Sequence, residues 1–200
     1  MFRRLRAPSL STLGWRQLLF DLVHRRYRHR QFITIAYLVL LTVLGVPDRL
    51  PVFFWAGSVM VAAGELVRLW ASGHVKKDKV LATSGPYAFV RHPLYVGNHT
   101  IAIGFCLASA LWWSLPVWIW LSLVFYPAAI SREDGVLQKN FGSQWEEWCG
   151  ETRALIPRLT PYRRSGRSEW SLRQSLRVNG EPVIAAFLFS CLYLLYLRVS

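Results

Sequence analysis

The feature that most constrains this chain is an alternation of long apolar runs with short basic segments. The apolar runs cover residues 32–46, 51–71, 94–113, 115–130 and 182–197. A helix needs about 20 apolar residues to cross a hydrocarbon core of roughly 30 Å, because each residue rises about 1.5 Å. The second and third runs have this length, whereas the other three are shorter. We therefore predict an all-α fold, an integral membrane helical bundle of about five transmembrane helices.

The basic residues fall almost entirely on one side of this predicted bundle. Nearly all of the 24 Lys and Arg residues lie in residues 1–31, 72–91 and 131–181, whereas the opposite side receives Arg49 and Arg198. Because Lys and Arg resist translocation next to a span, this pattern indicates a cytoplasmic N-terminus. The net charge of +13 at pH 7 thus has a topological cause, and it predicts contact with anionic membrane lipids. The basic residues form no recognisable nucleic-acid module, so no nucleic-acid partner is expected.

The spans divide the chain into four expected parts. These are a basic cytoplasmic N-terminal segment, a four-span core, a cytoplasmic linker and a C-terminal transmembrane helix, at residues 1–31, 32–160, 161–181 and 182–200. After the fourth span, apolar residues at helical spacing predict a cytoplasmic amphipathic helix over residues 133–148. The three cysteines are widely spaced, which argues against a disulfide framework and against a zinc site.

Chemically capable residues are densest between Gly85 and Gly97, in the sequence GPYAFVRHPLYVG. A Gly-Pro turn opens this segment. Pro93 suits the first turn of the third span, because the N–H group that proline lacks would be unpaired there. Arg91 and His92 lie at the expected membrane boundary. Each residue alone is typical of a membrane interface, but their clustering favours a binding site.

Two further groups of charged residues stand beside or within the apolar runs. Arg132, Glu133 and Asp134 follow the fourth span. They form either a charged first turn of the next helix, stabilised by its dipole, or a site whose carboxylates accept hydrogen bonds from a ligand. Glu65 and Arg68 are three residues apart within the second span, and this spacing favours a buried structural ion pair, because unpaired charge is costly there.

Taken in order, these segments resemble the isoprenylcysteine carboxyl methyltransferase family, whose wider group includes the phospholipid N-methyltransferases. The likeness rests on LATSGPY at 81–87, RHPLYVG at 91–97, Glu133-Asp134, and then Leu137, Phe141-Gly142, Trp145, Trp148 and Ile156-Pro157. It covers residues 64–159, about half of the chain. The ordered combination is specific, whereas RHPxYxG alone is only moderately so.

The resemblance implies a membrane enzyme that binds S-adenosylmethionine in a cytoplasm-facing pocket and admits a lipophilic methyl acceptor laterally from the bilayer. It places the cofactor contacts at Lys79, Val80, Leu81, Ala82, Tyr87, His92, Pro93, Leu94, Tyr95 and Glu133. These residue types suit the cofactor, because a carboxylate complements its amino group, its ribose hydroxyls or its sulfonium charge. The sequence contains no glycine-rich dinucleotide-binding fingerprint.

Two departures from the family bear on the acceptor. The family commonly has two glutamates where this chain has Glu133-Asp134, and eukaryotic members that methylate prenylcysteine have an arginine where this chain has Ala129. Because of these departures, the resemblance does not single out one acceptor. The expected acceptor is an isoprenylcysteine carboxylate, a phospholipid amine or another membrane-soluble oxygen, nitrogen or sulfur nucleophile. Arg132 or Arg91 would orient an anionic acceptor, and Asp134 would act as a base if the acceptor carries a proton.

Two other functions stay open at the level of sequence. One is an NADPH-dependent membrane reductase, because sterol reductases are similar around the Arg-His segment. The other is a non-enzymatic membrane scaffold that keeps the fold. The preferred location is a bacterial inner membrane, with an endoplasmic reticulum membrane of the same orientation as the alternative. The sequence carries no signal for an oligomeric state.

Overall fold

The structure is a computed structural model that describes residues 30–75, 80–164, 170–178 and 180–199. Within these residues all regular secondary structure is helical, which confirms the all-α prediction. The longer helices are α2 (Arg30–Leu44), α3 (Pro51–Ser72), α4 (Pro93–Ala108), α5 (Ser114–Phe141) and α7 (Glu181–Tyr196). A shorter helix, α6 (Ser143–Glu151), follows α5.

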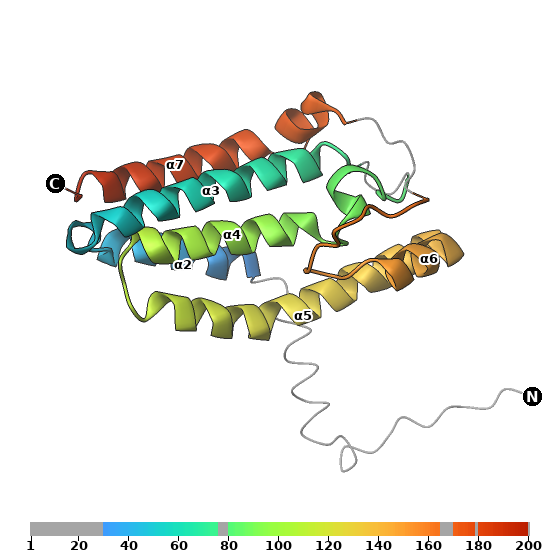
Figure 1. Cartoon of the computed structure of the whole chain (residues 1–200), viewed down its shortest axis with the longest axis horizontal. Helices are drawn as coiled ribbons and strands as arrows, with labels where there is room; N and C mark the ends of the chain where they lie inside the picture. Colours follow the sequence, from blue (N-terminus) through green and yellow to red (C-terminus); the bar gives the residue numbers. More distant parts are fainter. Residues whose placement is uncertain (1–29, 76–79, 165–169, 179, 200) are drawn as a thin grey trace, which may run out of the picture.

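The five longer helices form one bundle. Figure 1 shows α7, α3, α4 and α5 side by side in this order, with α2 behind α4. Helix α2 contacts α4, α5 and α7, so it closes the rear of the bundle. Buried apolar side chains from all five helices form one shared core, which includes Leu41, Phe54, Phe105, Trp118 and Leu195. The predicted runs at 32–46, 51–71 and 182–197 match α2, α3 and α7 closely.

Two of the helices, α3 with 22 residues and α5 with 28, are long and apolar enough to cross a membrane. Helices α2 and α7 are shorter apolar helices. Helix α4 has 16 residues and ends at Ala108, so the expectation of a full-length span at 94–113 was wrong. The chain turns there because Ala110 adopts a left-handed backbone conformation with φ of 53°, which a right-handed helix does not accommodate.

Residues 133–148 are helical as predicted except at Gly142, but they do not form a separate helix, because α5 does not end with its apolar part. It continues without a break through Glu133 and Asp134 to Phe141. Gly142, with φ of 51°, then ends it, and α6 is a separate helix. A glycine in a positive-φ conformation is a common helix terminator. The two carboxylates therefore project from the interior of a long helix and do not belong to the first turn of a helix.

Close packing of α3 against α4 depends on glycines of both helices. A Cβ atom on Gly64 would lie 2.8 Å from the carbonyl oxygen of Gly97, and one on Gly104 would lie 2.7 Å from that of Gly57. The backbones approach this closely only because side chains are absent at these points. The α3–α4 pair thus forms a rigid centre for the bundle.

The segments expected to carry chemistry gather at one end of the bundle (Figure 1). The chain between α3 and α4 lies there, together with α6, residues 152–164 and the start of α7. The chain between α3 and α4 contains a 3-10 turn, η4 (Gly85–Ala88). A π-helical turn, η5 (Gln174–Val178), precedes α7 and contacts α3. The connections from α2 to α3 and from α4 to α5 lie at the opposite end.

Candidate active site

A cavity of about 860 Å³ opens at the end where these segments gather. Its walls come from α2, α3, α4, α5 and α7, together with the chain around η4. This volume is within the range of small-molecule and cofactor sites. Its wall carries both polar and apolar side chains. Arg68, Arg91 and Glu133 provide charge, α7 contributes mainly aliphatic and aromatic side chains, and α2 contributes polar side chains together with the aliphatic Ile35 and Leu38.

The structure places most of the predicted cofactor residues on this one cavity. Those in its wall are Val80, Leu81, Ala82, Tyr87, Leu94, Tyr95 and Glu133. His92 and Pro93 are buried beside it but do not line it. Pro93 is the first residue of α4, as its position before the third apolar run predicted. Lys79 lies outside the described residues. Of the two residues predicted to act in catalysis, Asp134 lies behind the wall and Arg132 is exposed to solvent.

The η4 turn positions Tyr87 at the cavity. Gly85 has φ of 58°, and a Cβ atom there would collide with the ring of His74, so both the conformation and the space require glycine. The carbonyl of Tyr87 accepts a 3.0 Å hydrogen bond from Nε1 of Trp148, which is only 1% exposed. Burial raises the pKa of the Tyr87 hydroxyl, so this group remains a neutral hydrogen-bonding group.

The chain after α6 braces the same turn from outside. The backbone N–H of Tyr162 donates to the carbonyl of Ala88 at 2.8 Å. Similarly, the N–H of Arg91 donates to the carbonyl of Arg153 at 2.9 Å. These bonds satisfy backbone groups that lie outside any helix, and they hold the turn against the bundle. The segment from 152 to 162 therefore braces the η4 turn and the residues just before α4.

A compact polar cluster joins α4 to α5 at the cavity wall. The hydroxyl of Tyr95 donates a 2.7 Å hydrogen bond to Oε2 of Glu133. Nε2 of His92 lies 3.1 Å from Oδ1 of Asp134, and Nδ1 of His92 lies 3.6 Å from Glu133. Burial opposes the charged form of His92, but its contacts with Asp134 and Glu133 outweigh this effect and raise its pKa. The His92 and Tyr95 rings stack with centroids 5.3 Å apart.

The cluster leaves one carboxylate available to a ligand. The Glu133 side chain is 48% exposed and lines the cavity, whereas that of Asp134 is 16% exposed and faces His92 and Arg91. Nη1 of Arg91 is 3.5 Å from Oδ2 of Asp134 and also contacts the Cys149 sulfur. Nε of Arg91 is buried and has no hydrogen-bond partner among the described residues. Glu133 and Arg91 are thus the acceptor and the donor that face the cavity at this end.

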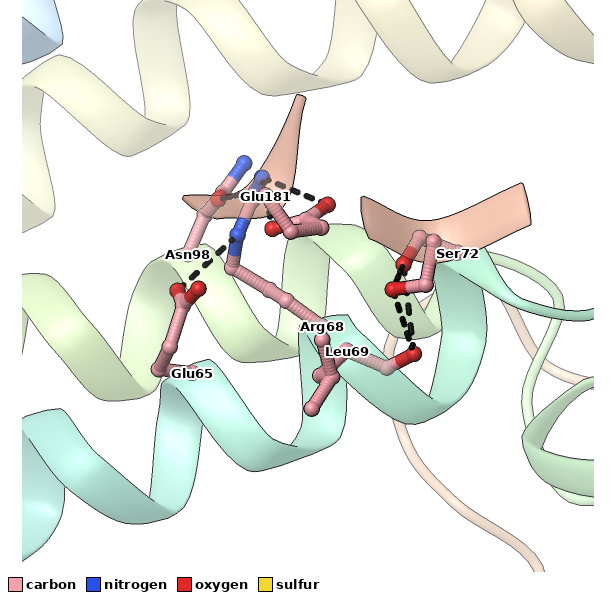
Figure 2. A network of polar contacts seen from close by, with 7 residues as sticks. Glu65, Arg68, Leu69, Ser72, Asn98 and Glu181 are labelled. Carbon is pink, nitrogen blue, oxygen red and sulfur yellow. Dashed lines mark hydrogen bonds and ion pairs between the residues drawn. The ribbon is translucent and has the colours of Figure 1, made fainter. Parts of the chain in front are cut away.

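A second polar network crosses the cavity wall on the α3 side (Figure 2). The sequence predicted a buried pair between Glu65 and Arg68, and their side chains approach to 3.6 Å, which confirms it. Sequence reasoning missed the other partners of Arg68, which are Asn98 on α4 and Glu181 at the start of α7. The only sequence signal for Glu181 is its position, as a lone acidic residue immediately before the last apolar run.

Arg30 is another cavity residue that sequence reasoning did not identify. Its guanidinium carbon lies 4.3 Å from the centroid of the Tyr95 ring and 5.4 Å from that of Tyr126, which is the geometry of a cation–π contact. All three residues line the cavity. Sequence reasoning treated Arg30 as one of many basic residues that set topology, and only the packing of α2 against α4 and α5 brings it to the site.

Comparison with known proteins gives a consistent result. The family model of the phospholipid methyltransferases matches residues 52–144. The cobalt-zinc-cadmium resistance protein CzcN of Cupriavidus metallidurans is 37% identical over 130 residues, which are 62% of this chain and 57% of that protein. The nickel-cobalt-cadmium resistance protein NccN of Alcaligenes xylosoxydans xylosoxydans is 35% identical over 112 residues, 54% of this chain and 51% of that protein.

A eukaryotic methyltransferase is also similar. The protein-S-isoprenylcysteine O-methyltransferase of Schizosaccharomyces pombe is 33% identical over 105 residues, which are 50% of this chain and 42% of that protein. The chain spans about half the length of the curated relatives that it matches. No solved structure matches it significantly. The family model, these relatives and the ordered motifs around the cavity together place this chain in the phospholipid and isoprenylcysteine methyltransferase family of membrane proteins.

Proposed function

We propose that this chain is an S-adenosylmethionine-dependent methyltransferase that acts on a lipophilic acceptor. The acceptor would present a nucleophilic oxygen, nitrogen or sulfur, as an isoprenylcysteine carboxylate or a phospholipid amine does. One observation carries the proposal. A single cavity joins seven of the residues predicted to hold the cofactor with an apolar surface formed by Ile35 and Leu38 of α2 and by the cavity face of α7. A site for a polar cofactor and a lipid requires both surfaces.

The residues in the cavity fit the cofactor chemically. S-adenosylmethionine carries an amino group, a carboxylate, ribose hydroxyls, a sulfonium charge and an adenine ring. The exposed carboxylate of Glu133 would accept hydrogen bonds from the amino group or the ribose hydroxyls. The guanidinium of Arg91, a residue that lines the cavity, suits the carboxylate. Leu81, Ala82 and Leu94 supply apolar surface for the adenine. The volume of about 860 Å³ leaves room for part of an acceptor as well.

The protein would contribute to catalysis mainly by positioning the acceptor against the methyl group of the cofactor. When bound, S-adenosylmethionine supplies a methyl group that its sulfonium has already activated, and the group is transferred by in-line displacement. The described residues then have to align the acceptor and keep water away. Tyr95 orients the Glu133 carboxylate, and residues 152–162 brace the η4 turn that positions Tyr87. We propose that Asp134 positions His92 and Arg91, because both of its oxygens face them. A base role for Asp134 and an acceptor-binding role for Arg132 stay predictions.

We further propose that α2, α4 and α7 cross the membrane as short spans beside α3 and α5. The cavity would then face the cytoplasm, because the basic segments lie at its end of the bundle. A bacterial inner membrane is the location that we propose. Reporter fusions after residues 49, 111 and 164 would test the orientation. An outward reporter signal at 164 would contradict it.

Calorimetric binding of S-adenosylmethionine to the detergent-purified chain tests the cofactor. We expect the wild type to bind and Glu133→Gln to bind about tenfold more weakly, because it loses a charge-assisted contact. Glu147→Gln is the matched control. Glu147 is an exposed carboxylate on α6 that pairs with Arg164 away from the cavity. Absence of binding by folded wild-type protein would refute the proposal, and binding of NADPH instead would favour the reductase alternative.

Transfer of a radiolabelled methyl group from S-adenosylmethionine tests the activity. A total lipid extract, a prenylated cysteine with a free carboxylate and phosphatidylethanolamine serve as the acceptors. Label incorporated into one of these classes by the wild type and lost in Glu133→Gln identifies the acceptor chemistry. Cofactor binding with no transfer to any lipid would favour the scaffold alternative.

A further inference from the structure

Helix α7 lies outside the segment that the family model matches, yet it supplies one wall of the cavity. Its contribution begins with Glu181 and continues with Ile184, Phe187 and Leu188, which recur along one helical face. The opposite face of α7 bears Phe189 and Tyr193, which are exposed. The cavity-facing side chains of α7 are all apolar or aromatic apart from Glu181, so the helix presents a mainly hydrophobic surface to the cavity.

The start of α7 is fixed to α3 by a buried charge pair (Figure 2). Nη2 of Arg68 donates to both carboxylate oxygens of Glu181 at 3.1 Å, and Nη1 donates to Oδ1 of Asn98. The side chains of Arg68 and Glu181 are only 11% and 3% exposed. Separating the helices would leave Glu181 unpaired and Arg68 with only its 3.6 Å ion pair to Glu65 and its bond to Asn98, so the interaction disfavours separation of the two helices.

Two other features of the α3 side support this attachment. The path of Arg68 depends on Gly97, because a Cβ atom there would lie 2.6 Å from Cγ of Arg68. One turn further along α3, the Ser72 hydroxyl lies 2.6 Å from that of Ser175 in η5, and Ser175 also donates to the carbonyl of Leu69. The segment leading into α7 is thus held at two points on α3, and both Arg68 and Ser72 line the cavity.

The apolar face of α7 shares the cavity with two aliphatic side chains of α2 and leads to the polar cluster. Ile35 and Leu38 of α2 line the same cavity. Leu38 and Leu188 belong to one buried cluster with Tyr95, and Ile184 and Phe187 pack against that cluster. Tyr95 in turn donates to Glu133. An apolar surface therefore continues from between α2 and α7 to the residues that we propose hold the cofactor.

We propose that the hydrocarbon chain of the methyl acceptor binds between α7 and α2, and that Glu181 is a positioning residue that sets this site through Arg68. The inference rests on the proposed function, because it takes the bound lipid to be the acceptor. Phe187 and Leu188 then determine which chains fit. This half of the site lies outside the segment that the family model matches.

Photolabelling of the full-length purified chain tests the site without knowledge of the natural acceptor. The probe is a long-chain fatty acid that carries a mid-chain diazirine, and labelled residues on α7 are located by mass spectrometry. We expect labelling of Ile184 and Phe187 to saturate as probe concentration rises. Labelling of Phe189, on the exposed face, should instead rise linearly with probe in the micelle. Linear labelling of both faces would overturn the proposal.

The positioning role of Glu181 is tested in the same assay. Glu181→Gln should lower the saturable labelling by about fivefold or more and leave labelling of Phe189 unchanged, because only the cavity wall depends on the Arg68 pair. Glu151→Gln, which alters an exposed pair with Arg158, is the matched control and should change neither. Undiminished saturable labelling in Glu181→Gln would overturn the role of this residue.

A second pair of variants keeps the test decisive if Glu181→Gln does not fold. Phe187→Ala should shift half-saturation by several-fold, whereas Phe189→Ala on the exposed face should not. Equal shifts of half-saturation in the two variants would contradict the assignment of Phe187 to the wall of the lipid site. Calorimetric binding of S-adenosylmethionine on the same preparations separates the two proposals. Saturable labelling without cofactor binding would refute the proposed function alone, and cofactor binding without saturable labelling would refute this inference alone.

Discussion

Replacing Gly104 by alanine tests whether the close approach of α3 and α4 sets the stability of the bundle. A Cβ atom at this position would lie 2.7 Å from the carbonyl oxygen of Gly57, 2.8 Å from Cγ2 of Val61 and 2.9 Å from the backbone N of Val61. Two of these three atoms belong to the backbone of α3 and cannot rotate away. The two helices would have to separate by a few tenths of an ångström along their shared face, which weakens many neighbouring contacts.

Overpacking of a close-packed interior costs about 1–3 kcal/mol. Alanine in place of glycine within a helix by itself gains about 1 kcal/mol. Gly135→Ala in α5 is the matched control, because an added Cβ atom there would have no neighbour within 4 Å. Both variants share the gain in helix propensity, so the difference between them isolates the packing cost. We expect Gly104→Ala to be less stable than Gly135→Ala by about 2 kcal/mol.

Reversible unfolding of the purified chain in mixed detergent micelles, followed by far-ultraviolet circular dichroism, measures this difference. The midpoint of Gly104→Ala should shift to lower denaturant with an unchanged slope, since the same surface is exposed on unfolding. If Gly104→Ala proved as stable as Gly135→Ala, α3 and α4 could not be packed backbone to backbone as described. The rigid centre of the bundle would then have to lie elsewhere.

Three other predictions concern the cavity and its supports. Tyr95→Phe removes the 2.7 Å hydrogen bond to Glu133, so calorimetry should show about tenfold weaker binding of S-adenosylmethionine; unchanged affinity would separate Glu133 from the cofactor site. The raised pKa of His92 means that its protonation stabilises the folded state fully below the ordinary pKa of 6.5 and that this contribution is lost as pH rises through the folded-state value. Unfolding titrations should therefore show the advantage of wild type over His92→Gln shrinking at alkaline pH, and a pH-independent advantage would contradict the ion pairing. Trp148→Phe should cost about 2 kcal/mol, because it leaves the Tyr87 carbonyl unpaired and opens a void at a fully buried position. Trp112→Phe, at a position 88% exposed, should cost less than about 0.5 kcal/mol, and equal losses would rule out a special role for Trp148.

The sequence predicted several elements closely because their signals are local. Helices α2, α3 and α7 coincide with apolar runs that are bounded by polar residues or proline. Pro93 begins α4, where its fixed φ and missing N–H group are suited to a first helical turn. The residues of the ordered motifs at 80–82, 87, 94 and 95 line one cavity, because they are near one another in sequence and share one turn and one helix start.

Helix lengths beyond the apolar runs were predicted less well. The sequence around Glu133 and Asp134 is compatible with both a helix start and a helix interior, since carboxylates occur in either place. Only the positive φ of Gly142 shows where α5 ends. In the same way, nothing in the run from 94 to 113 signals a turn at Ala110, because alanine ordinarily favours a helix. Tertiary packing overrides local preference at both points.

By itself, the sequence determined the helical class, the apolar elements and the family, because hydrophobic periodicity and short ordered motifs depend on neighbouring residues. The tertiary structure decided which charges share the cavity. Arg68 and Glu181 are 113 residues apart, and Arg30 reaches Tyr95 from a different helix. Contacts of this kind depend on how whole helices pack. The residues next to a buried charge in the sequence therefore do not indicate which distant residue pairs with it.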